Sequence, residues 1–214
     1  MAVTVTLAQL DQLAPQCSAA YRLAFGEGNP VLARYGIAET ALRVAHFMAQ
    51  ILHESGALTL EDENLRYSPQ RLAQVWPHRF RPLGPLDPRK FAWNPEKLAN
   101  EVYRGRMGNT QPGDGYLYRG RGMLQLTGRD NYAHASTLLR AGMPLAPDLT
   151  REPEAAVSAQ WSLHVAALTW EARGCNAAAD QDDVAKVSFL INGGDLGLAE
   201  RIIWTGKTRA IWLA

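Results

Sequence analysis

Two sites in the first third of the chain carry carboxyl groups whose setting suits acid–base chemistry. The first is Glu54, in the sequence His53-Glu54-Ser55-Gly56 at the end of a predicted helix. At about 100° per residue, Glu54 lies about 20° from Phe47, on the apolar face of that helix. Partial burial and the negative end of the helix dipole both favour a protonated carboxyl group, as a general acid requires. The alternative is a Glu54 that points into solvent or pairs with a nearby arginine.

The second site is the acidic loop Leu60-Glu61-Asp62-Glu63-Asn64. Its composition predicts exposure to solvent, so its carboxylates are expected to stay ionised, and Glu61, Asp62 and Glu63 all qualify as a base. A protonated acid and an ionised base on opposite sides of a cleft are what hydrolysis of a glycosidic bond requires. A solvated acidic turn without a catalytic role is the alternative.

Polar side chains that could hold a sugar or a water follow later in the chain. The glycines of residues 118–128 match neither G-x-G-x-x-G nor the phosphate-loop pattern, which argues against nucleotide binding. Gln125 and Thr127 alternate on a predicted extended segment, so their side chains are expected to point the same way. Asn192 precedes Gly193-Gly194 at the end of a predicted helix. It either belongs to a C-cap turn or presents its amide at the edge of a cleft.

The sequence does not favour a metal site. His53-Glu54 opens the pattern H-E-x-x-H of zinc proteases, but position 57 is Ala57 instead of a second histidine. The remaining histidines have no local spacing typical of metal ligands. We therefore expect no metal and no cofactor.

The elements that must position these groups are mainly helical. Residues 40–54 form the clearest helix, with Thr40 as N-cap candidate, a broad apolar stripe and Gly56 as its stop. Residues 77–95 are rich in proline and residues 104–122 in Gly, Tyr and Arg, which predicts an irregular middle. The other predicted helices are 6–24, 69–76, 95–103, 129–141, 153–173, 181–191 and 197–211. The pattern indicates a single mainly α domain over residues 1–214, long enough for two lobes.

The composition is that of an ordinary globular protein, with 47% hydrophobic and 20% charged residues among 214. Two distant cysteines indicate no disulfide framework. No apolar run is long enough to predict a membrane span, and the N-terminus does not resemble a signal peptide. The net charge of +1 conceals a basic middle, because residues 66–140 hold 13 Lys/Arg and 5 Asp/Glu, a balance of +8.

Taken together, these segments resemble the family 19 glycoside hydrolases, the chitinase-like group, and within it the endolysins of phages and prophages of Gram-negative hosts. The resemblance extends over roughly residues 37–200. The motifs that carry it are Phe47-Met48-Ala49-Gln50-Ile51-Leu52-His53-Glu54-Ser55-Gly56, Glu63-Asn64-Leu65-Arg66-Tyr67-Ser68, Arg71-Leu72 to Phe80, Tyr118 to Thr127 with Asn131-Tyr132, and Ile191-Asn192-Gly193-Gly194.

The resemblance implies a lysozyme-like, two-lobed helical fold with a substrate cleft. It makes Glu54 the general acid and selects Glu63, not Glu61 or Asp62, as the second carboxylate. It places Thr127 where a hydroxyl group positions the attacking water. Sugar contacts are implied for Tyr67, Tyr118, Gln125, Asn131 and Asn192. The implied mechanism is inverting, with carboxyl groups roughly 6.5–9.5 Å apart.

We therefore expect a monomeric endolysin that hydrolyses β-1,4 bonds in the glycan strand of bacterial peptidoglycan. The near alternative is a chitinase acting on GlcNAc polymers. The basic middle favours peptidoglycan, because chitin is neutral and peptidoglycan carries carboxylates. The absence of the disulfides of plant chitinases favours the microbial branch. A lytic transglycosylase would use Glu54 alone.

Two non-enzymatic interpretations are weaker. A wall-binding module would not need both glutamates, and a nucleic-acid binder lacks a helix-turn-helix or zinc pattern. Without a signal peptide, the protein is expected to accumulate in the host cytoplasm. It would reach the periplasmic wall through a separate membrane-lesion protein, without inserting into the membrane itself.

Overall fold

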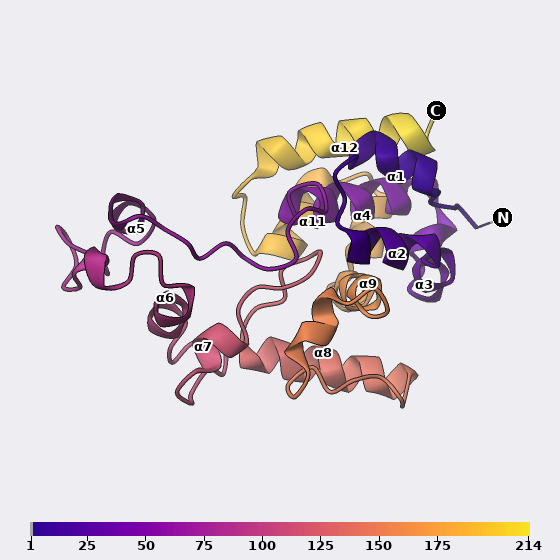
Figure 1. Ribbon diagram of the computed structural model, residues 1–214. Coiled ribbons are helices and arrows are strands. Elements are labelled where there is room, and N and C mark those ends of the chain that lie inside the picture. The colour runs from indigo at the N-terminus through magenta and orange to yellow at the C-terminus, as the bar shows by residue number, and fades with distance from the viewer. Residues whose placement is uncertain (1) are drawn as a thin grey trace.

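The computed structural model describes residues 2–214 and is mainly helical, with almost no strand, as the sequence predicts (Figure 1). Its α-helices are α1 Leu7–Leu13, α2 Ala19–Gly26, α3 Asn29–Arg34, α4 Ala41–Glu54, α5 Pro69–Val75, α6 Pro95–Val102, α7 Asp114–Leu117, α8 Arg129–Gly142, α9 Ser162–Ala172, α10 Cys175–Asp180, α11 Val184–Asn192 and α12 Leu198–Trp212. Short 3-10 helices lie at Ile37–Glu39, Pro88–Lys90 and Pro153–Val157. Among residues 2–214, no helix has both the length and the apolar character needed to cross a bilayer.

The larger lobe is built around α4, which runs through its centre. The hydroxyl of Thr40 caps α4, because it accepts a hydrogen bond from the backbone N–H of Arg43 (3.1 Å). All side chains from Val44 to Leu52 are buried, including polar ones. The C-terminal helix α12 packs along α4, with α1, α2, α9 and α11 around them (Figure 1). Glu54 is the last residue of α4, so the core of the protein fixes its backbone.

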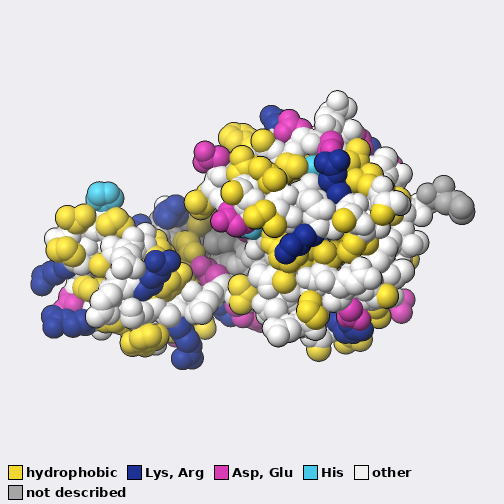
Figure 2. Space-filling view, turned by 90° about the horizontal axis from the view of Figure 1, so that it is seen from above, with side chains coloured by type: hydrophobic (Ala, Val, Ile, Leu, Met, Phe, Trp, Pro, Cys, Tyr) yellow, Lys and Arg dark blue, Asp and Glu magenta, His cyan; other side chains and the backbone are white. Residues whose placement is uncertain are grey.

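A smaller lobe, residues 65–103, contains α5 and α6 and stands apart from the larger lobe (Figure 1). Its proline-rich stretch is ordered because it folds over a separate hydrophobic cluster. The buried members of that cluster are Leu65, Leu72, Phe80, Phe91, Leu98, Ala99 and Val102. The surface is hollowed between the two lobes, and acidic side chains lie beside the hollow (Figure 2). The two-lobed helical fold expected from the sequence is confirmed.

Residues 118–128 lie between the lobes and form a tight turn. Arg121 makes isolated antiparallel bridges with Asp62 and with Leu126, which ties the turn to the acidic loop. Gly122 and Gln125 adopt positive φ angles of 81° and 51°. The prediction of an extended segment is therefore wrong here. The chain reverses because Gly122 tolerates a left-handed conformation that other residues rarely adopt.

Two predicted helices are each broken in the structure. Residues 6–24 form α1 and α2, because the chain turns at Pro15 and the hydroxyl of Ser18 caps a new helix at Tyr21 N–H (3.4 Å). Residues 153–173 form a 3-10 helix and then α9. Between them, the hydroxyl of Ser158 accepts a bond from the N–H of Trp161 (3.2 Å). The short helices α3, α7 and α10 were not predicted, since fewer than two turns carry little periodicity.

Candidate active site

Glu54 is held by an arginine that lies 147 residues later in the chain. Its side chain is 19% exposed, and Oε1 accepts a short hydrogen bond from Nη2 of Arg201 on α12, which is 2% exposed. The other terminal nitrogen of Arg201 donates to Oε1 of Gln50, one turn before Glu54 on α4. Within residues 2–214, no hydrogen bond reaches the second carboxylate oxygen, Oε2. The carboxylate is therefore fixed through one oxygen while the other is available.

The sequence left open that Glu54 pairs with an arginine, and the structure shows this ion pair. Arg201 thereby places a positive charge directly at the carboxyl group of Glu54. Next to it, the pKa of His53 is lowered, first by burial and then by the charge of Arg201. A Cβ atom on Gly197 would lie 2.8 Å from Nε2 of His53, so only glycine permits this approach. The turn before α12 thereby closes over the end of α4.

Glu63 is held by two neutral donors. The backbone N–H of Gly120 donates to Oε1 (2.7 Å), and the hydroxyl of Tyr103 donates to Oε2 (2.6 Å). The backbone N–H of Glu63 in turn donates to the carbonyl of Gly120 (3.0 Å). Burial, and then the negative charge of Glu63, raise the pKa of Tyr103 far above its ordinary value. The phenol therefore stays protonated and acts as a donor.

Three predicted site residues converge on Gly120. A Cβ atom there would lie 2.8 Å from Oε1 of Gln125, 3.1 Å from Oγ1 of Thr127 and 3.4 Å from Cβ of Glu63. Glycine is needed at position 120 because any side chain would displace this group. The hydroxyl of Thr127 donates to the carbonyl of Gln125 (2.9 Å), which leaves the hydroxyl oxygen free to accept. Gln125 and Thr127 thus face one point, as predicted, although a turn brings them there.

The neighbours of Glu63 in the acidic loop have other surroundings. Asp62 pairs with Arg119 (3.1 Å) and Arg121 (3.3 Å) and so fastens the loop to residues 118–128. The side chain of Glu61 makes no hydrogen bond or ion pair within residues 2–214, and its carbonyl accepts from Gly122 N–H (2.8 Å). Of the three acidic residues, Glu63 is therefore the one beside Thr127.

The remaining predicted sugar contacts lie on three separate elements of the fold. Asn131, exposed at the start of α8, donates its amide to the carbonyl of Thr127 (2.7 Å). Asn192 is exposed at the end of α11 and donates to the carbonyl of Leu196 (3.2 Å). Tyr67 belongs to the small lobe, where its ring packs edge-on against Trp76.

The sugar contact expected for Tyr118 is not supported by the structure. Its side chain is 2% exposed, and its hydroxyl donates to the carbonyl of Thr150 (3.0 Å). Its ring packs against Tyr132 of α8 in a third hydrophobic cluster. Tyr118 therefore supports the turn from behind and is not placed to contact a sugar.

Two residues that hold the glutamates, Arg201 and Tyr103, were not predicted from the sequence. Arg201 shares the buried face of α12 with Thr205 and Thr208, at helical spacing. A charged residue on that face was a readable signal of a buried partner. Tyr103 directly follows α6, and nothing in the local sequence relates it to Glu63.

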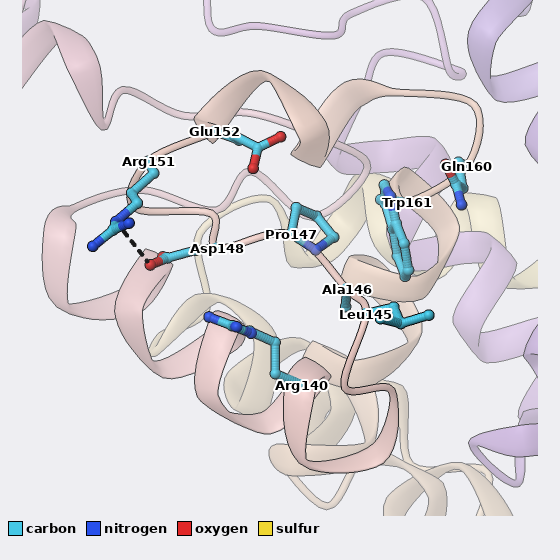
Figure 3. A pocket seen from close by; sticks show the side chains of 9 residues that line it. All are labelled: Arg140, Leu145, Ala146, Pro147, Asp148, Arg151, Glu152, Gln160 and Trp161. Atoms are coloured by element: carbon cyan, nitrogen blue, oxygen red, sulfur yellow. Dashed lines mark ion pairs between the residues drawn. The ribbon is translucent and has the colours of Figure 1, made fainter.

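The surface has two pockets of interest, and only one of them is lined by predicted site residues. The α8–α9 pocket has a volume of about 330 Å³ and is lined by Met107, Leu124, Gln125, Leu126, Thr127, Asn131, His134, Ala135, Leu138, Leu168, Thr169, Ala172 and Arg173. A larger pocket of about 660 Å³ lies at the other end of α8 (Figure 3) and is lined by Arg140, Leu145, Ala146, Pro147, Asp148, Arg151, Glu152, Gln160 and Trp161. Only the first contains predicted site residues. Among residues 2–214, no three His, Cys, Asp or Glu side chains are grouped to hold a metal ion.

The two-lobed helical fold, with two glutamates held in separate settings, defines the class as a lysozyme-like glycoside hydrolase. No family model matches the chain. It is 38% identical over 162 residues, 75% of either chain, to a glycosyl hydrolase family 19 domain-containing protein of Haemophilus influenzae. The chain therefore belongs to glycosyl hydrolase family 19, which confirms the expected family.

Solved structures agree on the fold. Chitinase C from Streptomyces griseus HUT6037 is 19% identical, with a TM-score of 0.64 over 98% of this chain and 93% of that one. A class IV chitinase of the same family from Zea mays is 15% identical, with a TM-score of 0.60 over 98% and 93%. A bacterial family 19 chitinase gives 19% identity and a TM-score of 0.58 over 95% and 94%. At these identities the likeness concerns the fold alone.

Proposed function

We propose that the chain is a single catalytic domain, an endolysin that hydrolyses β-1,4 bonds in the glycan strand of bacterial peptidoglycan. Glu54 acts as the general acid, Glu63 as the general base, and Thr127 positions the attacking water. Family membership supports glycan hydrolysis. The observation that carries the site assignment is the convergence of Glu63, Gln125 and Thr127 on Gly120.

This convergence suits the activation of a water molecule. Each oxygen of Glu63 accepts one hydrogen bond from the protein and keeps a lone pair for a further donor. The hydroxyl of Thr127 points its proton at the carbonyl of Gln125, so its oxygen accepts from the water. A water bound between the two presents its own oxygen to the anomeric carbon while Glu63 takes its proton. The attack occurs on the face opposite the leaving group and inverts the configuration.

The leaving oxygen needs a proton, and Oε2 of Glu54 is the atom that can deliver it. Once the proton is transferred, Glu54 becomes a carboxylate beside the positive charge of Arg201. The guanidinium group of Arg201 therefore lies where it attracts the carboxylate that the transfer leaves behind. Gln50 holds the guanidinium group in place. The bond between the anomeric carbon and the leaving oxygen breaks, and no covalent intermediate is required.

The charge distribution favours peptidoglycan over chitin as the substrate. Residues 66–140, which include the small lobe and the turn at Gly120, carry a balance of +8. Peptidoglycan bears carboxylates, which such a surface attracts, whereas chitin is neutral. Chitin remains the second candidate because the solved relatives are chitinases. Host lysis by a monomer, with passage to the wall through a separate membrane-lesion protein, belongs to the same proposal and rests on the resemblance to endolysins.

The test is product analysis with purified peptidoglycan and colloidal chitin. Mass spectrometry should detect reducing disaccharides from peptidoglycan, and NMR of the first product should detect the α-anomer. A β-anomer would exclude Glu63 as the base. Anhydro-sugars would identify a lytic transglycosylase instead, and cleavage of chitin alone would replace the proposed substrate.

A further inference from the structure

The α8–α9 pocket is lined by both polar and apolar side chains. Gln125 and Thr127, which meet Glu63 at Gly120, belong to its lining. Leu138 and Leu168, from α8 and α9, also line it. No Trp, Tyr or Phe lines this pocket, so it offers no aromatic face on which a sugar ring could stack. Its chemistry suits a small alkyl group that enters beside the glycosidic bond.

The size of the pocket exceeds what an acetamido group would fill. A volume of about 330 Å³ has room for about ten water molecules at liquid density. The acetamido group common to all GlcNAc-type sugars has only four heavy atoms. A lactyl ether group and the first amino acid attached to it have more than twice as many. N-acetylmuramic acid carries this larger substituent on every second sugar of peptidoglycan, and chitin carries none.

The charge of the pocket lining is unbalanced. Arg173 and His134 belong to the lining, and no acidic side chain does. Arg173 also donates to the carbonyl of Leu190 (3.0 Å) and, by a short bond, to that of Ile191, both near the end of α11. The larger pocket in Figure 3 differs, because it contains acidic as well as basic residues and one of its arginines pairs with a carboxylate (3.7 Å). An excess of positive charge attracts a carboxylate-bearing ligand.

We propose that the α8–α9 pocket receives the lactyl-peptide substituent of N-acetylmuramic acid, and that it determines the preference for peptidoglycan over chitin. This inference rests on the proposed function. The methyl groups of the lactyl and alanyl units pack against the leucine side chains that line the pocket, and the peptide carboxylates face Arg173. The sugar that bears the substituent is then bound directly beside Glu63 and Thr127.

Filling the pocket tests the proposal. Ala172 lines it from an exposed position at the end of α9, so Ala172→Trp adds bulk without disturbing the core. Thr169→Phe fills it from one turn earlier, and the hydroxyl that is lost bonds only to its own helix at Val165 (2.8 Å). Ala210→Trp, on the exposed face of α12, is the matched control. Circular dichroism and thermal unfolding establish that each variant is folded.

The readout is the binding of two soluble probes by isothermal titration calorimetry. One is the disaccharide GlcNAc-MurNAc bearing a dipeptide, and the other is a GlcNAc tetramer without the substituent. Ala172→Trp and Thr169→Phe should weaken muropeptide binding by about tenfold or more and leave tetramer binding within about twofold of Ala210→Trp. Equal weakening for both probes, or none for the muropeptide, would overturn the pocket assignment. Wild-type cleavage of peptidoglycan, measured in parallel, tests the proposed function separately.

Discussion

Glu54 and Glu63 are nine residues apart in the sequence, yet two different kinds of partner hold them. A charged side chain on α12 holds Glu54, and it is itself buried against α4. A backbone N–H and a phenol hold Glu63, and both are neutral. A cation interacts with a carboxyl group far more strongly when that group is ionised, whereas neutral donors mainly fix its orientation.

The two kinds of partner have different effects: the partner of Glu54 acts mainly through its charge, and the partners of Glu63 act mainly by orienting the carboxylate. At Glu54, the charge of Arg201 acts on the state that follows proton transfer. At Glu63, Gly120 and Tyr103 keep the carboxylate oriented towards the point that Thr127 also faces. We therefore expect substitutions near Glu54 to affect stability and rate together. Those near Glu63 should affect rate with little change in stability.

The largest effect should come from removing either carboxylate. Glu54→Gln and Glu63→Gln should each lower kcat on peptidoglycan by about 10³-fold, since general acid–base catalysis contributes about 10²–10⁴-fold. Glu61→Gln is the control in the same loop and should stay within about twofold of wild type. Release of reducing ends is the measurement. An active Glu63→Gln variant would remove Glu63 from the mechanism and leave a transglycosylase that uses Glu54 alone.

The next effect concerns stability and applies to the Glu54 side only. Arg201→Met should lower the free energy of unfolding by about 3 kcal/mol. This is the low end of the range for breaking a buried ion pair, because Glu54 is partly exposed. Arg209→Met on the same helix breaks an exposed pair with Asp182 (2.8 Å) and should cost at most about 1 kcal/mol. Urea unfolding measures both. Equal losses would show that Arg201 has no special role in holding α12 to α4.

A smaller effect is expected on the Glu63 side. Tyr103→Phe removes one donor to the carboxylate, so kcat should fall about tenfold and stability by about 1 kcal/mol. Because that donor orients the carboxylate beside the attacking water, KM for peptidoglycan should stay within about twofold of wild type while kcat falls. Tyr116→Phe is the control, as the hydroxyl of Tyr116 makes no hydrogen bond within residues 2–214. An unchanged kcat in Tyr103→Phe would assign Tyr103 to packing alone.

The sequence predicts the local part of this site well and its long-range part poorly. The cap at Thr40, the length of α4 and the placement of Glu54 at its end all follow from residue types within one helix. Gln125 and Thr127 were correctly expected to face one point, although the extended conformation was wrong. Which face of the turn is buried depends on α8, and so Tyr118 was misassigned.

Arg201 and Tyr103 could not be predicted for a related reason. Their bonds join residues 147 and 40 positions apart, and no periodicity encodes such a distance. The breaks at Pro15 and Ser158 follow from side-chain caps that compete with helix continuation, which an apolar pattern does not reveal. Tertiary packing therefore decides how each glutamate is held, while local sequence decides where it lies.

The smallest expected effect is on the pH dependence of stability, which should depend on His53 beside Glu54. Burial and the charge of Arg201 lower the folded-state pKa of His53 below its ordinary 6.5. As the pH falls through 6.5, the unfolded chain binds a proton at this position before the folded chain does, so stability decreases until the lower folded-state pKa is reached. When the pH is lowered from 7.5 to 5, the Tm of His53→Gln should therefore decrease less than the Tm of wild type. His78→Gln, an exposed position on the small lobe, should lose as much as wild type. Identical losses in both variants would mean that the Glu54 side is no more acid-sensitive than the rest of the protein.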